Sequence, residues 1–267
     1  MPLPQENLFS LTFPEAIWRI LPHPERDEWV VELRNAAQKT VSWALVDLAL
    51  NKIVWQEAPS ATEWWTTLAG FAGDGVFLHN YRFHDIPEPT DLLALSAAEG
   101  ELRWALPGWL FGRAAPEEGQ IIVTQKQAES IQQRFCDSEL GLLKDVIEEQ
   151  NLLPITAPNH RSPVRYGPED IYFAQLSSFL AKTVGVKDVI AVDYLESDPY
   201  LVFSYYLSEP EKTTQSLLVV NRNRETIYHN RLSDNRPGMS HDTILLQNDR
   251  LVFLRNTNEL ISLTLTH

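Results

Sequence analysis

The stretch Leu45-Val46-Asp47-Leu48-Ala49-Leu50-Asn51-Lys52-Ile53-Val54-Trp55 decides the fold, because a second stretch aligns with it without a gap. The second stretch begins 49 positions later and reads Ala94-Leu95-Ser96-Ala97-Ala98-Glu99-Gly100-Glu101-Leu102-Arg103-Trp104. Each contains an apolar run, an Asp or Ser, an Asn or Gly, and a second run that ends in Trp. Because Asp or Ser followed by Asn or Gly permits a tight turn, each stretch predicts a β-hairpin with a tryptophan in its second strand.

Three further segments are shorter or weaker copies of this pattern: Phe135–Leu143, Val220–Tyr228 and Leu254–Leu260. A single hairpin cannot bury its apolar face, and repeated hairpins of this kind form the blades of β-propellers, where an aromatic side chain packs against the next blade. The sequence therefore predicts an all-β protein with a β-propeller fold. The five copies predict five blades, and the long interval between the third and fourth copies leaves six or seven blades open.

Short apolar segments separated by Gly, Pro, Asn and Asp supply the strand signals. We expect strands near residues 7–13, 16–21, 29–35, 41–49, 52–57, 76–81, 92–97, 101–106, 120–125, 131–136, 189–194, 201–207, 217–221, 226–231, 243–246, 251–255 and 259–264. One inserted α-helix is expected over residues 168–184, where Tyr172, Leu176 and Phe179 follow helical spacing, Pro168 suits the first turn and Gly185 can end the helix. We also expect strand 7–13 to pair with strand 259–264, since the last sheet would otherwise keep a free edge.

Composition places the chain among ordinary globular proteins, with 44% hydrophobic and 22% charged residues over 267 positions. We expect one domain over residues 1–267. The net charge of −14 disfavours nucleic acid and anionic membrane surfaces as partners, and the apolar runs are too short for a transmembrane helix. Cys136 is the only cysteine, and residues 1–13 lack the features of a secretory signal. We therefore expect a cytoplasmic protein, and we expect it to be a monomer.

Two resemblances accompany these patterns. The segment Leu92–Trp104 resembles the repeat of quinoprotein-type propellers, in which an Ala-Leu-Asp turn precedes Gly and a following Trp. The order of the motifs Ile17-Trp18-Arg19-Ile20, Glu32-Leu33-Arg34, Val46-Asp47-Leu48, Ile53-Val54-Trp55, Trp64-Trp65, Leu78-His79-Asn80-Tyr81, Asp193-Tyr194-Leu195 and Ser204-Tyr205-Tyr206 resembles an uncharacterised Bacteroidetes family of about this length. The second resemblance implies a single domain and assigns no activity or catalytic residue. Neither resemblance implies a quinone, and we expect no cofactor.

The densest polar segment is His79-Asn80-Tyr81-Arg82-Phe83-His84-Asp85-Ile86-Pro87-Glu88-Pro89, a strand end that continues into a proline-restricted loop. We expect its residues His79, Tyr81, Arg82, His84 and Asp85 to bind a ligand. In this interpretation the forked guanidinium of Arg82 recognises a carboxylate or carbonyl, while His84 and Asp85 form hydrogen bonds. His79 and His84 fall on opposite faces of an extended segment, so no metal site is expected. The alternative is a hairpin loop that faces water, with His79 hydrogen-bonded beneath it.

Four other motifs each have a structural alternative. The pair Trp64-Trp65 either stacks on a sugar or peptide or packs between blades. His160 and Arg161 belong either to an anion-binding loop or to a solvated connector. The pairs His84-Asp85 and His241-Asp242 resemble acid–base dyads, but neighbouring strand residues diverge and no nucleophilic serine motif accompanies them. Asp137 beside Cys136 should raise the pKa of the thiol, which argues against a nucleophilic cysteine.

Two classes of function remain. The first is a non-catalytic binding module that presents one propeller face to an unknown protein or small-molecule ligand. The second is an enzyme, a hydrolase or lyase, with an active site in the central channel. Residues from distant segments would meet in that channel, so the sequence does not decide between the two classes.

Overall fold

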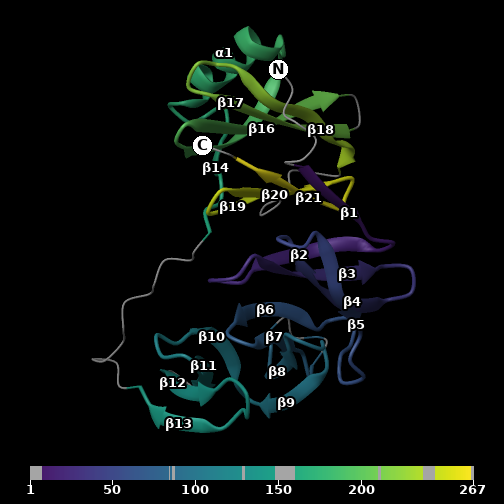
Figure 1. The fold of residues 1–267 in the computed structure, drawn as a ribbon, viewed down its shortest axis with the longest axis vertical. Coiled ribbons are helices and arrows are strands. Elements are labelled where there is room, and N and C mark those ends of the chain that lie inside the picture. Colours follow the sequence, from purple (N-terminus) through teal and green to yellow (C-terminus); the bar gives the residue numbers. More distant parts are fainter. Residues whose placement is uncertain are drawn as a thin grey trace. The chain divides into compact units, whose positions relative to one another are not determined.

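The computed structural model describes residues 8–83, 85, 88–127, 130–147, 160–209, 212–236 and 244–265. These residues form five antiparallel sheets and one helix (Figure 1). The prediction of an all-β protein with one inserted helix is therefore confirmed. Contacts within the chain divide it into two compact units, one spanning Glu15–Pro158 and the other combining Met1–Pro14 with Asn159–His267.

The unit Glu15–Pro158 contains three four-stranded sheets, each formed by strands consecutive in sequence. The first sheet consists of β2 (Ala16–Pro22), β3 (Glu28–Asn35), β4 (Thr40–Asp47) and β5 (Lys52–Glu57). The second consists of β6 (Thr67–Ala72), β7 (Gly75–Asn80), β8 (Asp91–Ser96) and β9 (Leu102–Pro107). The third consists of β10 (Leu110–Ala114), β11 (Gln120–Gln127), β12 (Ser130–Asp137) and β13 (Leu143–Val146). We call this part the three-sheet unit.

The other part, the two-sheet unit, contains a five-stranded sheet, a helix and a four-stranded sheet. The five-stranded sheet consists of β14 (Val164–Tyr166), β15 (Val189–Ser197), β16 (Tyr200–Glu209), β17 (Lys212–Asn221) and β18 (Thr226–Arg236), with α1 (Phe173–Val184) between β14 and β15. The four-stranded sheet consists of β19 (Ile244–Gln247), β20 (Arg250–Arg255), β21 (Glu259–Thr264) and β1 (Leu8–Thr12).

Strand β1 is separated by most of the chain from its partner β21, and the two pair antiparallel over five residues from Leu8↔Leu263 to Thr12↔Glu259. Beyond the strand, the Phe13 N–H donates to the Asn258 carbonyl over 2.9 Å. The predicted pairing of the N-terminal strand with residues 259–264 is confirmed. It gives β21 a second neighbour and so removes a free strand edge.

All five aligned segments form antiparallel hairpins: β4–β5, β8–β9, β12–β13, β17–β18 and β20–β21. Each turn contains at least one residue with positive φ: Asn51, Gly100, Gly141 and Arg224 in the first four, and both Asn256 and Thr257 in the last. Asn and Gly tolerate this left-handed region best. In four of the five turns, the Asn or Gly of the sequence pattern is therefore explained by the backbone that the turn requires.

The tryptophan of the repeat connects successive sheets of the three-sheet unit. Trp55 of the first sheet donates its indole N–H to the Ala97 carbonyl in the second sheet's hairpin over 2.7 Å. Trp104 of the second sheet donates in the same way to Ser138 in the third sheet's hairpin over 3.2 Å. A Cβ on Gly100 would lie 2.7 Å from the Trp55 ring, and one on Gly141 would lie 2.7 Å from the Trp104 ring. Each tryptophan thus packs on the glycine of the next copy.

Helix α1 begins at Phe173, five residues later than the predicted Pro168. The expectation that Pro168 occupies the first helical turn is wrong, because Asp170 closes a separate turn: its carboxylate accepts the Gly167 N–H over 2.6 Å, and its carbonyl accepts the Phe173 N–H. The helix ends as predicted at Gly185, which has φ of 72°.

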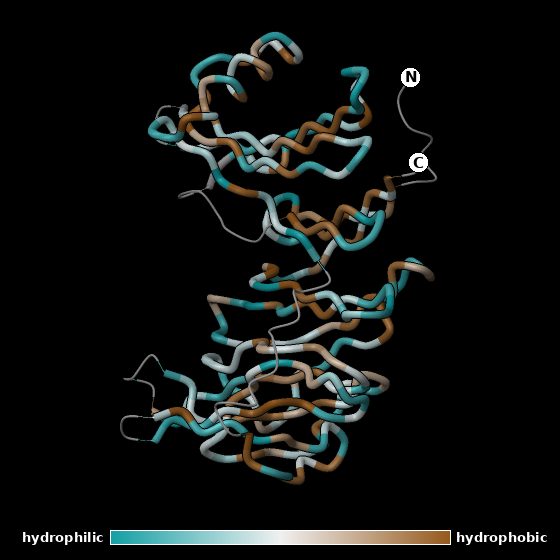
Figure 2. Tube along the Cα trace, turned by 90° about the vertical axis from the view of Figure 1, so that its left-hand side faces the viewer, coloured by the Kyte–Doolittle hydropathy of each residue, from teal (hydrophilic) through white to brown (hydrophobic). Residues whose placement is uncertain are grey.

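Apolar clusters lie between consecutive sheets and beneath the helix. In the three-sheet unit one cluster joins the first and second sheets and another joins the second and third. In the two-sheet unit one face of the five-stranded sheet packs on the four-stranded sheet, and the other face packs on α1. Figure 2 shows the hydrophobic stretches running along the strands of these sheets.

Candidate functional site

The predicted site begins at the end of β7, where His79 is half-buried and bonded to a neighbouring sheet. Its Nε2 accepts the backbone N–H of Phe111 in β10 over 3.0 Å. Burial, reinforced by the charge of Arg19, lowers the pKa of His79 to about 4. The imidazole is therefore neutral near pH 7, with its proton on Nδ1. This arrangement matches the structural alternative, a histidine hydrogen-bonded beneath the loop.

Arg82, the proposed ligand donor, is bonded to the protein itself. Its guanidinium contacts both carboxylate oxygens of Asp91, with Nε at 3.3 Å. Asp91 also accepts the Gly108 N–H over 2.9 Å and the Thr90 hydroxyl over 3.1 Å. Partial burial opposes ionisation of Asp91, but the bonds from Arg82 and Gly108 outweigh it and lower its pKa. Arg82 keeps an exposed side chain, and its main role in the described contacts is to fix the two ends of the loop.

Of the remaining predicted residues, the structure describes Tyr81 and Asp85. Tyr81 is half-buried, and Asp85 and Phe83 are exposed. His84 lies outside the described residues, as does the His241-Asp242 pair. The structure thus has His79, Tyr81, Arg82 and Asp85 on one segment, but Nε2 of His79 and two of the three guanidinium nitrogens of Arg82 form internal hydrogen bonds.

A second loop, between β5 and β6, is attached directly to the predicted site. The Thr66 hydroxyl donates to the side-chain oxygen of Asn80 over 2.9 Å, immediately before Tyr81. The same hydroxyl accepts the Glu63 N–H over 2.9 Å, which closes the turn containing Trp64 and Trp65. Trp64 is half-buried and Trp65 is 47% exposed. One indole therefore packs inward and the other faces solvent.

Trp64 packs against a buried ion pair in the first sheet. The Arg34 guanidinium lies 5.0 Å from the ring centres of both Trp64 and Trp18. It also donates to Glu32 over 2.7 Å and to the Trp64 and Thr66 carbonyls over 2.8 and 3.1 Å. These contacts use three of the five N–H donors of the guanidinium, one on each nitrogen. Arg34, which is buried, therefore holds the tryptophan loop in position.

Trp18 is exposed because β2 contains a β-bulge. Ile17 pairs with Leu33 and Arg19 pairs with Glu32, so Trp18 is an extra residue in the strand. Its side chain is 65% exposed. A β-bulge re-aims a side chain and recurs next to functional sites. The corresponding strands of the next two sheets have the same irregularity at Ala69 and Gly112.

These three bulged strands, β2, β6 and β10, are edge strands of their sheets, and β6 lies against both others. The Arg19 guanidinium donates to the Leu68 carbonyl over 2.6 Å, and the Phe111 ring occupies the space where a side chain of Gly70 would stand. The first strands of all five sheets, β2, β6, β10, β14 and β19, contain no Asp, Glu, His or Cys, but they contain Arg19, Arg113 and Arg165.

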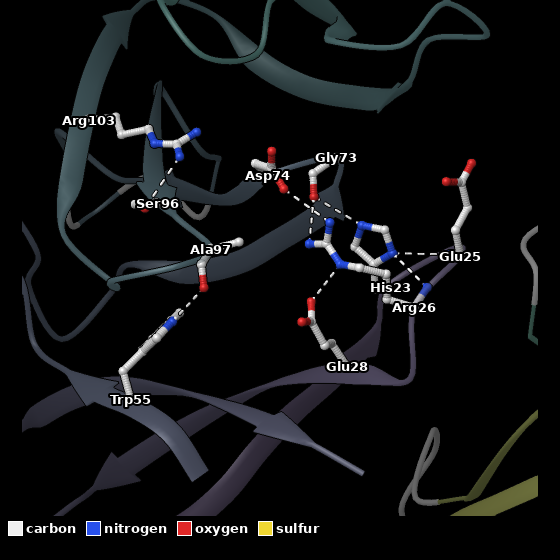
Figure 3. A network of polar contacts seen from close by, with 10 residues as sticks. All are labelled: His23, Glu25, Arg26, Glu28, Trp55, Gly73, Asp74, Ser96, Ala97 and Arg103. Carbon is white, nitrogen blue, oxygen red and sulfur yellow. Dashed lines mark hydrogen bonds and ion pairs between the residues drawn. The ribbon is translucent and has the colours of Figure 1, made fainter. Parts of the chain in front are cut away.

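A polar network joins the other ends of β2 and β6 (Figure 3). His23 Nδ1 accepts the backbone N–H groups of Glu25 and Arg26, each over 3.0 Å, so its Nε2 bears the proton and donates to the Gly73 carbonyl over 3.0 Å. Arg26 contacts Glu28 over 2.7 Å and Asp74 over 3.0 Å. Burial, followed by the charge of Arg26, lowers the pKa of His23. The network connects two turns and leaves His23 with both ring nitrogens bonded.

The other motifs have structural roles among the described residues. Arg161 exchanges backbone hydrogen bonds with Leu246 and donates to the Glu196 carbonyl over 3.0 Å. Cys136 is buried, and burial together with Asp137 raises the pKa of its thiol to about 11. The predicted rise is therefore confirmed, with burial as the larger cause. Within the described ranges, no group of three or more His, Cys, Asp or Glu could hold a metal ion.

Trp18 and Arg19 were not predicted as site residues, although the sequence contains a signal for them. Ile17 and Ile20 are buried, while the two residues between them are exposed. A regular strand buries alternate residues, so apolar positions three apart indicate an extra residue. The break in alternation at Ile17-Trp18-Arg19-Ile20 is the sequence signature of this bulge.

Comparisons with known proteins give a family match to part of the chain and several distantly similar solved structures. A model described as a domain of unknown function, DUF4905, matches residues 23–104. No curated protein matches the chain by sequence. No helix in the part of the chain that the structure describes is long and apolar enough to cross a membrane.

Three solved structures are similar to this chain over most of its length, with low identity and low TM-scores. BamB from Moraxella catarrhalis is 10% identical with a TM-score of 0.35, and the match covers 89% of this chain and 82% of BamB. An uncharacterised protein of Listeria monocytogenes is 10% identical with a TM-score of 0.36, covering 92% and 94% of the two chains. A DUF4221 family member from Bacteroides vulgatus is 8% identical with a TM-score of 0.30, covering 94% and 78%.

Proposed function

We propose that this chain is a non-catalytic binding module whose partner is a protein. The partner docks on the aromatic loop surface, which we define as Trp18, Trp64, Trp65, Tyr81 and Phe83. The observation that carries this proposal is the exposure of three large aromatic side chains on connected segments: Trp18 at 65%, Trp65 at 47% and Phe83 at 55%. Trp and Tyr dominate the energetics of protein interfaces because they bury a large area at low entropic cost.

The rigidity of the two loops supports binding further. The Thr66–Asn80 bond joins the loops, Arg34 fixes Trp64, and the Arg82–Asp91 pair fixes the ends of the second loop. A preorganised surface loses less conformational entropy on association. In this proposal Arg82 and Asp85 form a polar rim, His79 positions the loop through its bond to Phe111, and His84 contributes a hydrogen bond to the partner.

The composition of the first strands also supports binding over the enzymatic alternative. In a propeller these strands line the central channel, where a hydrolase or lyase would place its acid and base. Here β2, β6, β10, β14 and β19 contain no Asp, Glu, His or Cys. Their exposed positions at the β2 bulge are an indole and a guanidinium, which bind ligands but are poor proton carriers at neutral pH.

We propose in addition that the five sheets are the blades of one propeller domain. Each is an antiparallel sheet whose strands follow each other in sequence, apart from β1. Strand β1 completes the last sheet, as closure of a ring by the two chain ends requires. Small-angle X-ray scattering tests this proposal: a ring gives a single-peaked distance distribution, and a two-lobed distribution would contradict it.

Site-specific photocrosslinking tests the docking surface. A photoreactive phenylalanine analogue replaces Trp65 in one variant and Ile171, which is 85% exposed in the two-sheet unit, in a matched control. The partner that crosslinks at position 65 is identified, purified and titrated against the wild type and the double variant Trp65→Ser/Phe83→Ser.

We expect crosslinking at position 65 but not at position 171, and a loss of affinity of at least about tenfold in the double variant, as for interface hot spots. The variant should keep the melting temperature of the wild type, because both side chains are exposed. Equal crosslinking at both positions, or unchanged affinity in the folded double variant, would place the partner elsewhere.

A further inference from the structure

We propose that Arg19 and Trp18 together recognise a carboxylate that the partner carries next to an apolar group. This inference rests on the proposed function, because Trp18 belongs to the aromatic loop surface, and it specifies the chemistry recognised there.

Arg19 is the first element of the argument. It is exposed, and its described hydrogen bond is a donation from one terminal nitrogen to the Leu68 carbonyl over 2.6 Å. No described carboxylate forms an ion pair with the Arg19 guanidinium, whereas Arg26, Arg34, Arg82 and Arg165 all have acidic partners. Glu32, which lies opposite Arg19 in β3, bonds to Arg34, Thr67 and the Leu68 N–H instead. A guanidinium has five N–H donors, so Arg19 retains donors in a fork that matches a carboxylate.

The surroundings of Arg19 favour an anion although the chain as a whole is acidic. Strands β2, β6 and β10 contribute Arg19 and Arg113 and no acidic residue, in a chain of net charge −14. The nearby imidazole of His79 is committed to the Phe111 N–H and carries no charge near neutral pH. The carboxylate of Glu32, opposite Arg19 in β3, is already bonded to Arg34, Thr67 and the Leu68 N–H. An incoming carboxylate therefore meets Arg19 without a competing acidic residue on β2, β6 or β10.

The overall charge also selects the kind of anion. A net charge of −14 repels a dianion more strongly than a monoanion. One unpaired guanidinium can neutralise a single charge. A carboxylate fits these conditions better than a phosphate monoester.

Trp18 supplies the apolar part of the site. It directly precedes Arg19 at the β-bulge, and its ring lies 5.0 Å from the Arg34 guanidinium, which fixes it from one side. Its 65% exposure leaves much of the indole open to solvent. An apolar or aromatic group attached to the carboxylate can pack on this indole while the carboxylate contacts Arg19.

Benzoate is a minimal probe of this arrangement, since it combines a carboxylate with an aromatic ring. We propose to titrate benzoate, benzamide and phenyl phosphate into the full-length protein, and to follow the indole N–H of Trp18 and the side-chain Nε–H of Arg19 by NMR. Benzamide has the same shape without charge. The variants are Arg19→Gln and Trp18→Ala, and the matched control is Arg103→Gln, an exposed arginine on the outer strand β9.

Benzoate should shift both signals and bind more tightly than benzamide or phenyl phosphate. Arg19→Gln should weaken benzoate binding by at least about tenfold, as expected for a charge-assisted hydrogen bond. Trp18→Ala should also weaken it, and Arg103→Gln should leave it unchanged. A thermal melt of each variant verifies folding.

The inference is overturned if benzoate shifts neither signal, if benzamide or phenyl phosphate binds as well, or if Arg19→Gln binds benzoate like the wild type. The proposed function has an independent test, because crosslinking at position 65 requires no carboxylate. If a specific partner crosslinks at Trp65 but benzoate does not bind, only the inference of carboxylate recognition is overturned. If benzoate binds but no such partner is found, only the proposal of a protein partner is overturned.

Discussion

In the three-sheet unit, successive sheets are connected by contacts between a tryptophan of one repeat and a glycine of the next. Gly100 has φ of 76°, and the position of its missing Cβ lies 2.7 Å from the Trp55 ring. This position therefore requires both a left-handed backbone and room for the close approach of a ring. Glycine, which has no Cβ, satisfies both requirements, and this explains the recurring Gly of the sequence pattern.

We predict that Gly100→Ala destabilises the protein more than Gly73→Ala. Both positions have positive φ, but nothing lies within 4 Å of a Cβ on Gly73. Gly73→Ala therefore measures backbone strain alone, about 1 kcal/mol. Gly100→Ala adds displacement of the Trp55 ring, for a further cost of about 1–3 kcal/mol. Urea unfolding of the two variants measures the difference in their free energies of unfolding. Equal losses of this free energy would show that the Trp55 ring moves aside without cost.

His79 gives a prediction for pH. Its folded pKa lies at about 4, below the unfolded value of about 6.5, so the unfolded chain binds more protons between these values. The free energy of unfolding should therefore be fully retained above pH 6.5 and decline as the pH falls toward 4. His79→Gln, whose amide oxygen can accept the Phe111 N–H, should flatten this decline. Urea unfolding across this window measures it, and identical slopes for both proteins would assign the decline to other groups.

At the scale of elements, the sequence predicted strands where apolar residues alternate and missed them where glycine or shortness hides the alternation. Strands β6 and β10 contain Gly70 and Gly112, and glycine weakens a strand signal. Gly70 is there because the Phe111 ring occupies its side-chain space, a tertiary contact that no local pattern reveals. Strand β14 has three residues and β13 has four, and most of their residues are polar or exposed, whereas the equally short β19 is an apolar run and was predicted.

The candidate site was predictable only in part for a related reason. The sequence placed His79, Tyr81, Arg82 and Asp85 on one strand end and the loop that follows it, because residues close in sequence stay close in space. It did not show that Arg82 forms an ion pair with Asp91. Nor did it show that the loop containing Trp64 and Trp65 is hydrogen-bonded to Asn80 through Thr66. Such contacts join residues from different strands, so they depend on register and on the order of sheets.

Helix α1 supports an element-scale prediction. Leu180 is fully buried against the five-stranded sheet, and the next residue, Ala181, is exposed. Leu180→Asp should destabilise the protein by at least about 3 kcal/mol, since it buries an unpaired charge and loses apolar contact. Ala181→Asp should cost less than about 1 kcal/mol. Thermal and urea unfolding compare the two, and equal stability would show that the helix does not contribute to the folded core.

At the scale of the whole molecule, three contacts join segments that are far apart in the sequence. They are the hydrogen bonds of Trp55 and Trp104 and the pairing of β1 with β21. Each makes the stability of one segment depend on another. Within the three-sheet unit, Trp55 and Trp104 each bond to the hairpin of the next sheet, so we expect these sheets to unfold together. In the two-sheet unit, the first strand of the chain stabilises the last. Unfolding of either chain end should therefore spread beyond its own strand.

If the five sheets form one propeller domain, this coupling extends over the entire chain, and unfolding should be a single cooperative transition. Calorimetry tests this directly, because a two-state transition has equal calorimetric and van't Hoff enthalpies. Leu180→Asp, in the two-sheet unit, should then lower the one melting temperature. Two separate transitions, with only one shifted by Leu180→Asp, would instead show that the units defined by residues 15–158 and by the rest of the chain are independent domains. The aromatic loop surface and Arg19 belong to the first of these units, so in that case residues 15–158 alone should retain benzoate binding.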